Sequence, residues 1–258
     1  MSVTEYDVII LGAGVAGLTA GAFMASRGLQ VALVTAGEPT ACLSTGCIDV
    51  CSGDHSPLAG IKLLPEEHPY HLVPENTIRE SLNNFITAMQ EMGIPYSGTL
   101  AENRLVLSAL GTFKTSCLVP STMKAVPQDN GDSIHIISFA GLKDFYPGYI
   151  ISRRPNTEFS VYDAGVASTM GIAAHFEKDD FLQYFISWLK RQNITADRIA
   201  FPAVLGLESA DRIVRTMALR LGKPVFEIPT IPPSMPGRRL FNALKDYFRK
   251  KGGTIYWG

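Results

Sequence analysis

The stretch "DVIILGAGVAGLTAG", residues 7–21, decides the fold of this chain. Residues 6–11 are mostly apolar and β-branched, which is typical of a buried parallel strand. Small and apolar residues over 15–26 then predict a helix that stops at Gly28, and "VALVT" at 31–35 predicts a second strand. Together these segments form a βαβ unit of about 30 residues, the start of a Rossmann-like nucleotide-binding domain.

Glycines stand between the first strand and the helix, at positions 12, 14 and 17. In this pattern the first glycine permits a tight turn, the second lets backbone N–H groups approach a phosphate, and the third lets the helix pack closely on the sheet. The positive end of the helix favours the negative phosphate. We therefore expect a cofactor phosphate to be bound by Gly12, Ala13, Gly14, Val15, Ala16 and Gly17. The alternative is a glycine-rich turn that binds no ligand.

The second strand ends at Thr35, where a dinucleotide-binding fold usually carries Asp or Glu to bind the adenosine ribose. A threonine hydroxyl can still hydrogen-bond a ribose hydroxyl, so Thr35 is a candidate cofactor contact. Its neutrality also leaves room for a mononucleotide flavin or a 2′-phosphate. Equally, Thr35 can simply end the strand, and the sequence leaves both interpretations open.

Composition and charge narrow the class of protein. The chain has 258 residues, 46% of them hydrophobic, which is enough for one large domain or two modest ones. Its 23 Lys and Arg nearly balance its 24 Asp and Glu, so no basic surface for nucleic acid is predicted. No apolar run approaches the roughly 18 residues of a membrane span, and the first residues lack the pattern of a signal peptide. We expect a cytoplasmic protein.

The rest of the chain predicts an α/β fold with an insertion. A helix is expected over 74–92 and two strands around Gly111, followed from residue 133 by a regular alternation of strands and helices. The expected strands lie at 134–139, 159–161, 198–203 and 225–228, with helices after Gly141 and at 177–190 and 208–221. A helix at 238–251 and a strand from 254 close the chain. We predict a flavin-binding domain at 1–73 and 231–258, a covering segment at 74–132 and an inserted α/β unit at 133–230.

Several longer segments carry a family resemblance. They are "GAGVAGL" at 12–18, "STGCIDV" at 44–50, "HPYHLVPE" at 68–75, "LGTFKTSCLVP" at 110–120, "GLKDF" at 141–145, "FPAVLGLE" at 201–208 and "IPTIPPSMPGRRL" at 228–240. The whole chain resembles the B subunit of anaerobic glycerol-3-phosphate dehydrogenase. The glycine loop alone is typical of any flavoprotein or NAD enzyme, whereas the later segments are specific to this type of subunit.

The resemblance implies a flavoprotein, with FMN the expected cofactor and FAD open from the glycine motif. It implies partners, namely a catalytic A subunit and an iron–sulfur C subunit that anchors the complex to the cytoplasmic face of the membrane. The implied reaction oxidises glycerol 3-phosphate to dihydroxyacetone phosphate and passes electrons toward quinone in anaerobic respiration. Family members are longer, so the chain is expected to be truncated after the last strand.

Further site candidates follow from the position of the 44–49 segment, which lies along the flavin in flavoproteins of this shape. We expect Ser44, Thr45 and the Gly46 amide to contact the cofactor, although a surface loop is the alternative. The basic residues Lys114, Arg238 and Arg239 are candidates for holding a phosphate, because ammonium and guanidinium groups suit that anion. Solvated side chains are the alternative for all three. No residue is assigned as a catalytic acid or base.

The cysteine and the histidine residues suggest two other kinds of site. Cys42 and Cys47 are placed like the redox pair of a flavin- and NAD(P)H-dependent disulfide oxidoreductase, but no second glycine fingerprint follows. The spacing of Cys42, Cys47 and Cys51 matches no ferredoxin pattern, so small apolar fillers are the favoured role. His68 and His71 flank a proline that spoils a metal-binding pair, and no metal site is predicted.

The sequence therefore predicts a flavoprotein oxidoreductase subunit that is active in a complex. A subunit that binds flavin only as an electron relay, with no substrate site of its own, stays open as the alternative.

Overall fold

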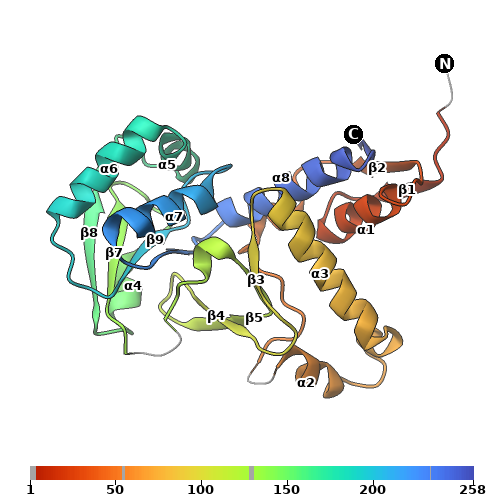
Figure 1. Cartoon of the computed structure of the whole chain (residues 1–258), viewed down its shortest axis with the longest axis horizontal. Helices are drawn as coiled ribbons and strands as arrows, with labels where there is room; N and C mark the ends of the chain where they lie inside the picture. Colours follow the sequence, from red (N-terminus) through yellow and green to blue (C-terminus); the bar gives the residue numbers. More distant parts are fainter. Residues whose placement is uncertain (1–3, 54–55, 128–130, 233) are drawn as a thin grey trace.

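The computed structural model describes residues 4–53, 56–127, 131–232 and 234–258. Position 233, within the proline-rich segment singled out in the sequence, lies outside the described residues. The two parallel sheets confirm the prediction of an α/β fold. They lie at opposite ends of the molecule, and helix α8 (Met235–Lys250) runs between them (Figure 1).

The first sheet is the predicted βαβ unit with one added strand. Strands β1 (Val8–Leu11), β2 (Val31–Thr35) and β11 (Thr254–Trp257) are parallel in the order β1-β2-β11. Helix α1 (Val15–Ala25) and helix α8 pack together on one face of this sheet. The last strand, which the sequence predicts, thus returns beside β2.

Close packing in this unit depends on glycine. A methyl group at Gly17 would overlap the carbonyl oxygen of Gly12, so the third glycine of the motif has a structural role. At Gly21, one turn later, an added Cβ would lie 2.9 Å from the ring of Phe248 on α8. Both positions confirm that α1 needs glycine to lie close to its neighbours.

The second sheet is formed by residues that follow position 133. Its four parallel strands have the order β10-β9-β7-β8 and span Ile134–Phe139 (β7), Thr157–Tyr162 (β8), Arg198–Pro202 (β9) and Val225–Ile228 (β10). The accompanying helices are α4 (Pro147–Ile151), α5 (Thr169–Phe176), α6 (Asp179–Arg191) and α7 (Ala210–Leu221). These elements lie within the predicted insert, 133–230, and its boundaries stay a prediction.

Helix α5 was not predicted. The segment is only eight residues long and has small residues rather than a clear apolar period, but Ser168 caps it by accepting a hydrogen bond from the Gly171 amide at 3.1 Å. The aromatic stripe of α6 is core, because Phe185 is fully buried and its ring lies 5.0 Å from that of Phe176. Trp188 packs against the same core from a partly buried position.

Between β2 and β7 the chain forms further helices and two antiparallel strand pairs. They are η1 (Thr40–Leu43), α2 (Pro57–Lys62), η2 (Pro69–Leu72), α3 (Glu75–Glu91), η3 (Ser121–Met123) and the antiparallel pairs β3 (Tyr96–Gly98) with β6 (Leu118–Pro120) and β4 (Arg104–Leu107) with β5 (Phe113–Ser116). The pair β4–β5 confirms the two strands predicted around Gly111. Within the described ranges, no helix combines the length and apolar character needed to cross a bilayer.

Helix α8 begins at Met235, inside the proline-rich segment, whereas the sequence predicts a start near Arg238. The Ser234 hydroxyl accepts a hydrogen bond from the Gly237 amide at 3.3 Å and so caps the helix. Pro236 fits the first turn because its missing N–H would have no partner there. Proline in this case starts the helix.

A buried ion pair joins α8 to the second sheet. Arg239 donates to the carboxylate of Glu227 on β10 at 2.5 and 2.9 Å, and both side chains are almost completely buried. The same guanidinium donates twice to the carbonyl of Gly206, at 2.8 and 2.6 Å. Glu227 in turn accepts from the Leu205 amide at 2.9 Å. All these groups have partners, so the charges are tolerated in the interior.

The start of α7 is capped from a distance. One carboxylate oxygen of Glu177 accepts from the amides of Leu207, Glu208 and Ser209, at 2.7, 2.7 and 3.1 Å. Burial opposes ionisation, yet these backbone hydrogen bonds outweigh it and lower the pKa of Glu177. Glu177 therefore takes the place that a capping side chain usually has, since Ser209 makes no such bond.

We predict that Arg239→Met lowers the free energy of unfolding by about 3–5 kcal/mol, because it leaves the buried carboxylate of Glu227 without its cation. The neighbouring Arg238→Met is the matched control. Arg238 pairs at 2.9 Å with Glu38, whose side chain is 65% exposed, so its loss should cost about 0–1 kcal/mol. Denaturant unfolding measures both. Equal losses of unfolding free energy in the two single variants would contradict the assignment. So would a double variant, Arg239→Met with Glu227→Gln, that is no more stable than Arg239→Met alone.

Candidate functional site

The glycine loop turns the chain from β1 into α1. Gly12 has a φ of 98°, a left-handed conformation that strongly favours glycine, and its amide donates to the Val34 carbonyl at 2.8 Å. Gly14 precedes the first residue of α1 with extended backbone angles. The loop is therefore tied to β2 at its first residue and ends at the N-terminus of the helix.

The N-terminus of α1 is open to a ligand. No side chain caps it, and an added Cβ at Gly12 or Gly14 would meet no atom within 4 Å. The first amides of a helix lack partners within the helix and carry partial positive charge. Small residues at this end thus leave room for an anionic group beside free N–H donors, which is the fit that a cofactor phosphate requires.

Thr35 lies under the loop at the end of β2. Its side chain is buried, and its hydroxyl oxygen accepts a hydrogen bond from the Ala13 amide at 3.3 Å. One role of Thr35 is thus to hold the loop in place. The hydroxyl proton remains to be donated, so contact with a cofactor hydroxyl stays a prediction.

The 44–46 segment is held by its own polar groups. The Ser44 hydroxyl donates to the Ala41 carbonyl at 2.8 Å and accepts from the Gly46 amide at 3.1 Å, and the Thr45 hydroxyl accepts from the Cys47 amide at 3.5 Å. The Gly46 amide, one of the predicted donors, is therefore engaged within the turn. Direct cofactor contacts by Ser44, Thr45 and Gly46 stay predictions.

Neighbouring elements fix this segment from two sides. The start of α8 approaches it so closely that a methyl group at Gly237 would overlap the Ala41 carbonyl oxygen, and one at Gly46 would lie 3.0 Å from the carbonyl of Pro236. On the other side, the Tyr96 hydroxyl donates to the Gly46 carbonyl at 2.6 Å. Burial raises the pKa of Tyr96, which keeps this donor protonated.

Sequence reasoning missed Tyr96 and Gly237. Tyr96 is separated from Gly46 by 50 residues, and nothing in the local pattern pairs the two. The close approach at Gly237 could have been predicted from the sequence. A glycine inside a helix is unfavourable unless the backbone must approach another segment there.

The three basic candidates all have acidic partners. Lys114 lies 2.5 Å from Asp49, Arg238 pairs with Glu38, and Arg239 is held by Glu227 in the interior. The structure assigns Arg239 a structural contact and leaves little of it accessible to a phosphate. Lys114 and Arg238 are partly exposed, and a phosphate role for them stays a prediction.

The four cysteines are free thiols. Cys42 is buried in the core, which agrees with the predicted role of a small apolar filler, and Cys117 is buried as well. Burial raises the pKa of Cys47 despite opposing effects of the Thr45 hydroxyl and Lys114, and it also raises the pKa of Cys42. Thiolate chemistry is therefore disfavoured at the pair that a disulfide oxidoreductase would use.

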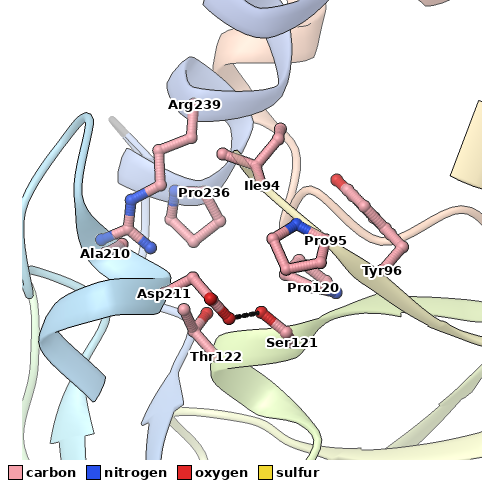
Figure 2. A pocket seen from close by; sticks show the side chains of 10 residues that line it. All are labelled: Ile94, Pro95, Tyr96, Pro120, Ser121, Thr122, Ala210, Asp211, Pro236 and Arg239. Carbon is pink, nitrogen blue, oxygen red and sulfur yellow. Dashed lines mark hydrogen bonds between the residues drawn. The ribbon is translucent and has the colours of Figure 1, made fainter. Parts of the chain in front are cut away.

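Three further features of the described residues concern metal and cofactor binding. His68 accepts from the Tyr70 amide at 3.2 Å and so caps the short helix η2. The described ranges contain no group of three or more His, Cys, Asp or Glu side chains placed to hold a metal. The cavity in Figure 2, bounded in part by Tyr96, Pro236 and Arg239, has a volume of about 20 Å³ and admits water rather than a cofactor.

Comparison with known proteins identifies the family. The FAD binding domain family matches residues 7–256, almost the whole chain. The chain belongs to this family. The match covers the glycine loop, both sheets and α8, and the resemblance noted in the sequence is confirmed by the relatives described next.

Curated relatives share one name, the B subunit of anaerobic glycerol-3-phosphate dehydrogenase. The chain is 30% identical to the protein of that name from Pectobacterium atrosepticum, 27% identical to that from Yersinia pseudotuberculosis and 26% identical to that from Haemophilus ducreyi. Each alignment covers 98% of this chain and 66% of the relative, so the chain spans about two thirds of their length. No solved structure matches.

Membership of the FAD binding domain family supports a flavin cofactor for this chain. Cofactor binding by the glycine loop stays a prediction, and the structure leaves the N-terminus of α1 beside that loop open. The 44–46 segment lies beyond β2, where α8 and Tyr96 hold it rigid.

We predict that Gly17→Ala destabilises the fold, whereas Gly14→Ala leaves the free energy of unfolding nearly unchanged. The Gly17 methyl group would clash with the Gly12 carbonyl, so the free energy of unfolding should fall by about 1–3 kcal/mol. The Gly14 methyl group meets open space, so that variant should lose about 1 kcal/mol or less. Denaturant unfolding distinguishes them. A larger loss at Gly14 than at Gly17 would contradict this account of the loop.

We also predict slow alkylation of Cys47 at neutral pH. Because the raised pKa keeps the thiol protonated, its reaction with iodoacetamide should be slower than that of free cysteine and should accelerate only in alkaline solution. Peptide mass spectrometry of samples quenched at several pH values gives the rate. Fast labelling of Cys47 at pH 7 would restore the disulfide interpretation.

Proposed function

We propose that the chain is the flavin-binding part of a B subunit of anaerobic glycerol-3-phosphate dehydrogenase. The observation that carries this proposal is the similarity over 98% of the chain to relatives of that name, together with a glycine loop whose helix N-terminus is open. Fold alone would leave the substrate undecided, because this architecture serves many reactions.

Each segment of the proposed site contacts a different part of the cofactor. Amides from Gly14 to Gly17, at the start of α1, bind the phosphate, because those of Gly12 and Ala13 are engaged with Val34 and Thr35. Thr35 supports the loop and offers a hydroxyl, and the 44–46 segment lines the rest of the cofactor. Bound flavin would supply an acceptor for the two electrons of the substrate. The protein's own contribution is to bind, orient and exclude water.

FAD is the cofactor favoured by the family, whose description names it. FMN, implied by the sequence resemblance, remains the alternative because Thr35 lacks the charge that usually holds an adenosine ribose. The domain division at residues 73, 132 and 230 belongs to the same proposal, with the 74–132 segment covering the flavin.

The reaction proposed for the whole complex removes two electrons and two protons from glycerol 3-phosphate and gives dihydroxyacetone phosphate. The electrons pass toward quinone. The complex includes an A subunit and an iron–sulfur C subunit, and these partners hold this chain at the cytoplasmic face of the membrane. Substrate oxidation belongs chiefly to the A subunit, and Lys114 and Arg238 are the candidates in this chain for holding the substrate phosphate.

We predict that the purified chain has a flavin absorbance spectrum, and that Gly14→Ala weakens flavin binding at least tenfold while keeping its fold. The added methyl group would enter the space that the phosphate needs. Fluorescence titration with FAD and FMN measures the affinity and shows which is preferred. Gly28→Ala is not a suitable control, since Gly28 has a positive φ, but Gly148→Ala, also in open space, is matched. Equal affinity in Gly14→Ala would contradict the proposed phosphate site.

Reduction by glycerol 3-phosphate tests the substrate. If glycerol 3-phosphate bleaches the flavin of the isolated chain, substrate oxidation takes place in this chain. Bleaching only in the presence of an A subunit would favour an electron relay. No bleaching in the assembled complex would reject the substrate assignment.

A further inference from the structure

The second sheet has a bare edge at strand β8. The strand order β10-β9-β7-β8 leaves β8 with one neighbour, and the parallel register with β7 runs without a break from Ile134↔Thr157 to Phe139↔Tyr162. Edge strands in natural proteins are usually short, bent by a bulge or protected by Lys or Pro. Strand β8 has six residues, contains neither Lys nor Pro, and carries one charged side chain, that of Glu158. Its free edge therefore suits pairing with a further strand.

Hydrogen bonds to β7 show which backbone groups of β8 point outward. The Asn156 carbonyl accepts from the Ile134 amide at 3.0 Å, and the Tyr162 carbonyl accepts from the Ala140 amide at 2.9 Å. Backbone groups alternate between the two edges of a strand, so the even-numbered residues face β7. The residues whose N–H and C=O groups point away from β7 are Thr157, Phe159 and Val161. Among the described residues, no segment bonds to the backbone of these three on the outer side.

Exposed apolar side chains lie beside this edge. Phe159 is 49% exposed and Val161 is 52% exposed. Both point to the opposite face of the sheet from Tyr162, whose ring centroid lies 4.8 Å from that of Phe185 on α6. Helix α4 contacts β8, and its residue Tyr149 is 57% exposed. The edge is thus bordered by aromatic side chains, which are enriched at protein interfaces.

A second β8 strand fits this edge in an antiparallel arrangement. With a two-fold axis beside Phe159, each Phe159 lies opposite its own copy, and Thr157 lies opposite Val161 of the other chain. All three outward residues then find backbone partners, and the cross-strand pairs are aromatic with aromatic and β-branched with β-branched. Glu158 lies opposite Ser160 of the other chain. No like charges therefore lie opposite each other in this register.

Charge, symmetry and position favour a second copy as the occupant. The net charge of the chain is −1, whereas a net charge far from zero is what opposes self-association. Two-fold dimers are the commonest assemblies of identical chains, and a strand identical to β8 makes each pair of this register twice. Strand β8 lies at the far end of the molecule from β1 and α1 (Figure 1), so the contact leaves the glycine loop open.

We propose that two copies of this chain pair through their β8 strands and form one continuous sheet across a two-fold axis. Phe159 lies at the axis, Val161 lies beside it, and Tyr149 borders the contact. The inference rests on the edge of the second sheet and does not require that the proposed flavin or substrate be correct.

Sedimentation analysis of the 258-residue chain tests this proposal. The protein should sediment as a dimer with twice the 28.0 kDa mass of one chain. Phe159→Lys places two like charges opposite each other at the axis, so the dissociation constant of the dimer should rise by about tenfold or more. Tyr184→Lys changes an aromatic residue on α6 that is 62% exposed, and this matched control should leave the constant unchanged. Circular dichroism checks that both variants fold.

A disulfide tests the register without adding a charge. Cα atoms of a hydrogen-bonded antiparallel pair lie about 5.5 Å apart, which a disulfide can span. Phe159→Cys should therefore give a disulfide-linked dimer under mild oxidation, and peptide mass spectrometry should locate the bond at residue 159 of both chains. Tyr184→Cys should give no such dimer.

Several results would overturn the proposal. A chain that stays monomeric at about 100 μM would exclude a dimer of useful affinity. A dimer that is equally tight in folded Phe159→Lys, or that forms no disulfide at residue 159, would use another surface. A monomer in which the thiol of Phe159→Cys is protected from maleimide only after an A subunit is added would assign the edge to that partner.

Discussion

The close contact of α8 with both halves of the molecule is the constraint on which the rest of the structure depends. Near its end, Phe248 packs against Gly21 and Gly253 of the first sheet's unit. At its start, Gly237 lies against the 41–44 backbone, and Arg239 reaches the buried carboxylate of Glu227. Helix α8 therefore positions three parts of the molecule relative to one another, namely helix α1, the 44–46 segment and the second sheet (Figure 1).

Local patterns in the sequence were enough to predict most of the elements. The strands at 31–35, 134–139 and 225–228 have the predicted bounds, because continuous apolar runs between turn residues are typical of buried parallel strands. The turn between the first strand and the helix was predicted as well, since Gly12 has a positive φ and Gly17 lies against the Gly12 carbonyl. Family membership then indicated FAD as the cofactor of the chain, which geometry alone does not do.

The remaining features depend on contacts between distant segments, which no local pattern contains. Arg239 was a candidate for phosphate by its chemistry, yet its partner on β10 makes it part of the interior. Glu177 caps a helix that begins over thirty residues later, and Tyr96 holds a turn fifty residues earlier. The start of α8 shows a different error, because the helix was predicted to begin at residue 238, after the prolines, although proline suits the first turn of a helix.

The central claim is that amides of the glycine loop bind a cofactor phosphate. Hydrogen–deuterium exchange of the 12–17 amides measures this most directly, with FAD, FMN and riboflavin as ligands. The claim predicts slower exchange in the loop with FAD or FMN and little change with riboflavin, which carries the ring but no phosphate. Equal protection by riboflavin, or no protection by either phosphorylated flavin, would contradict it.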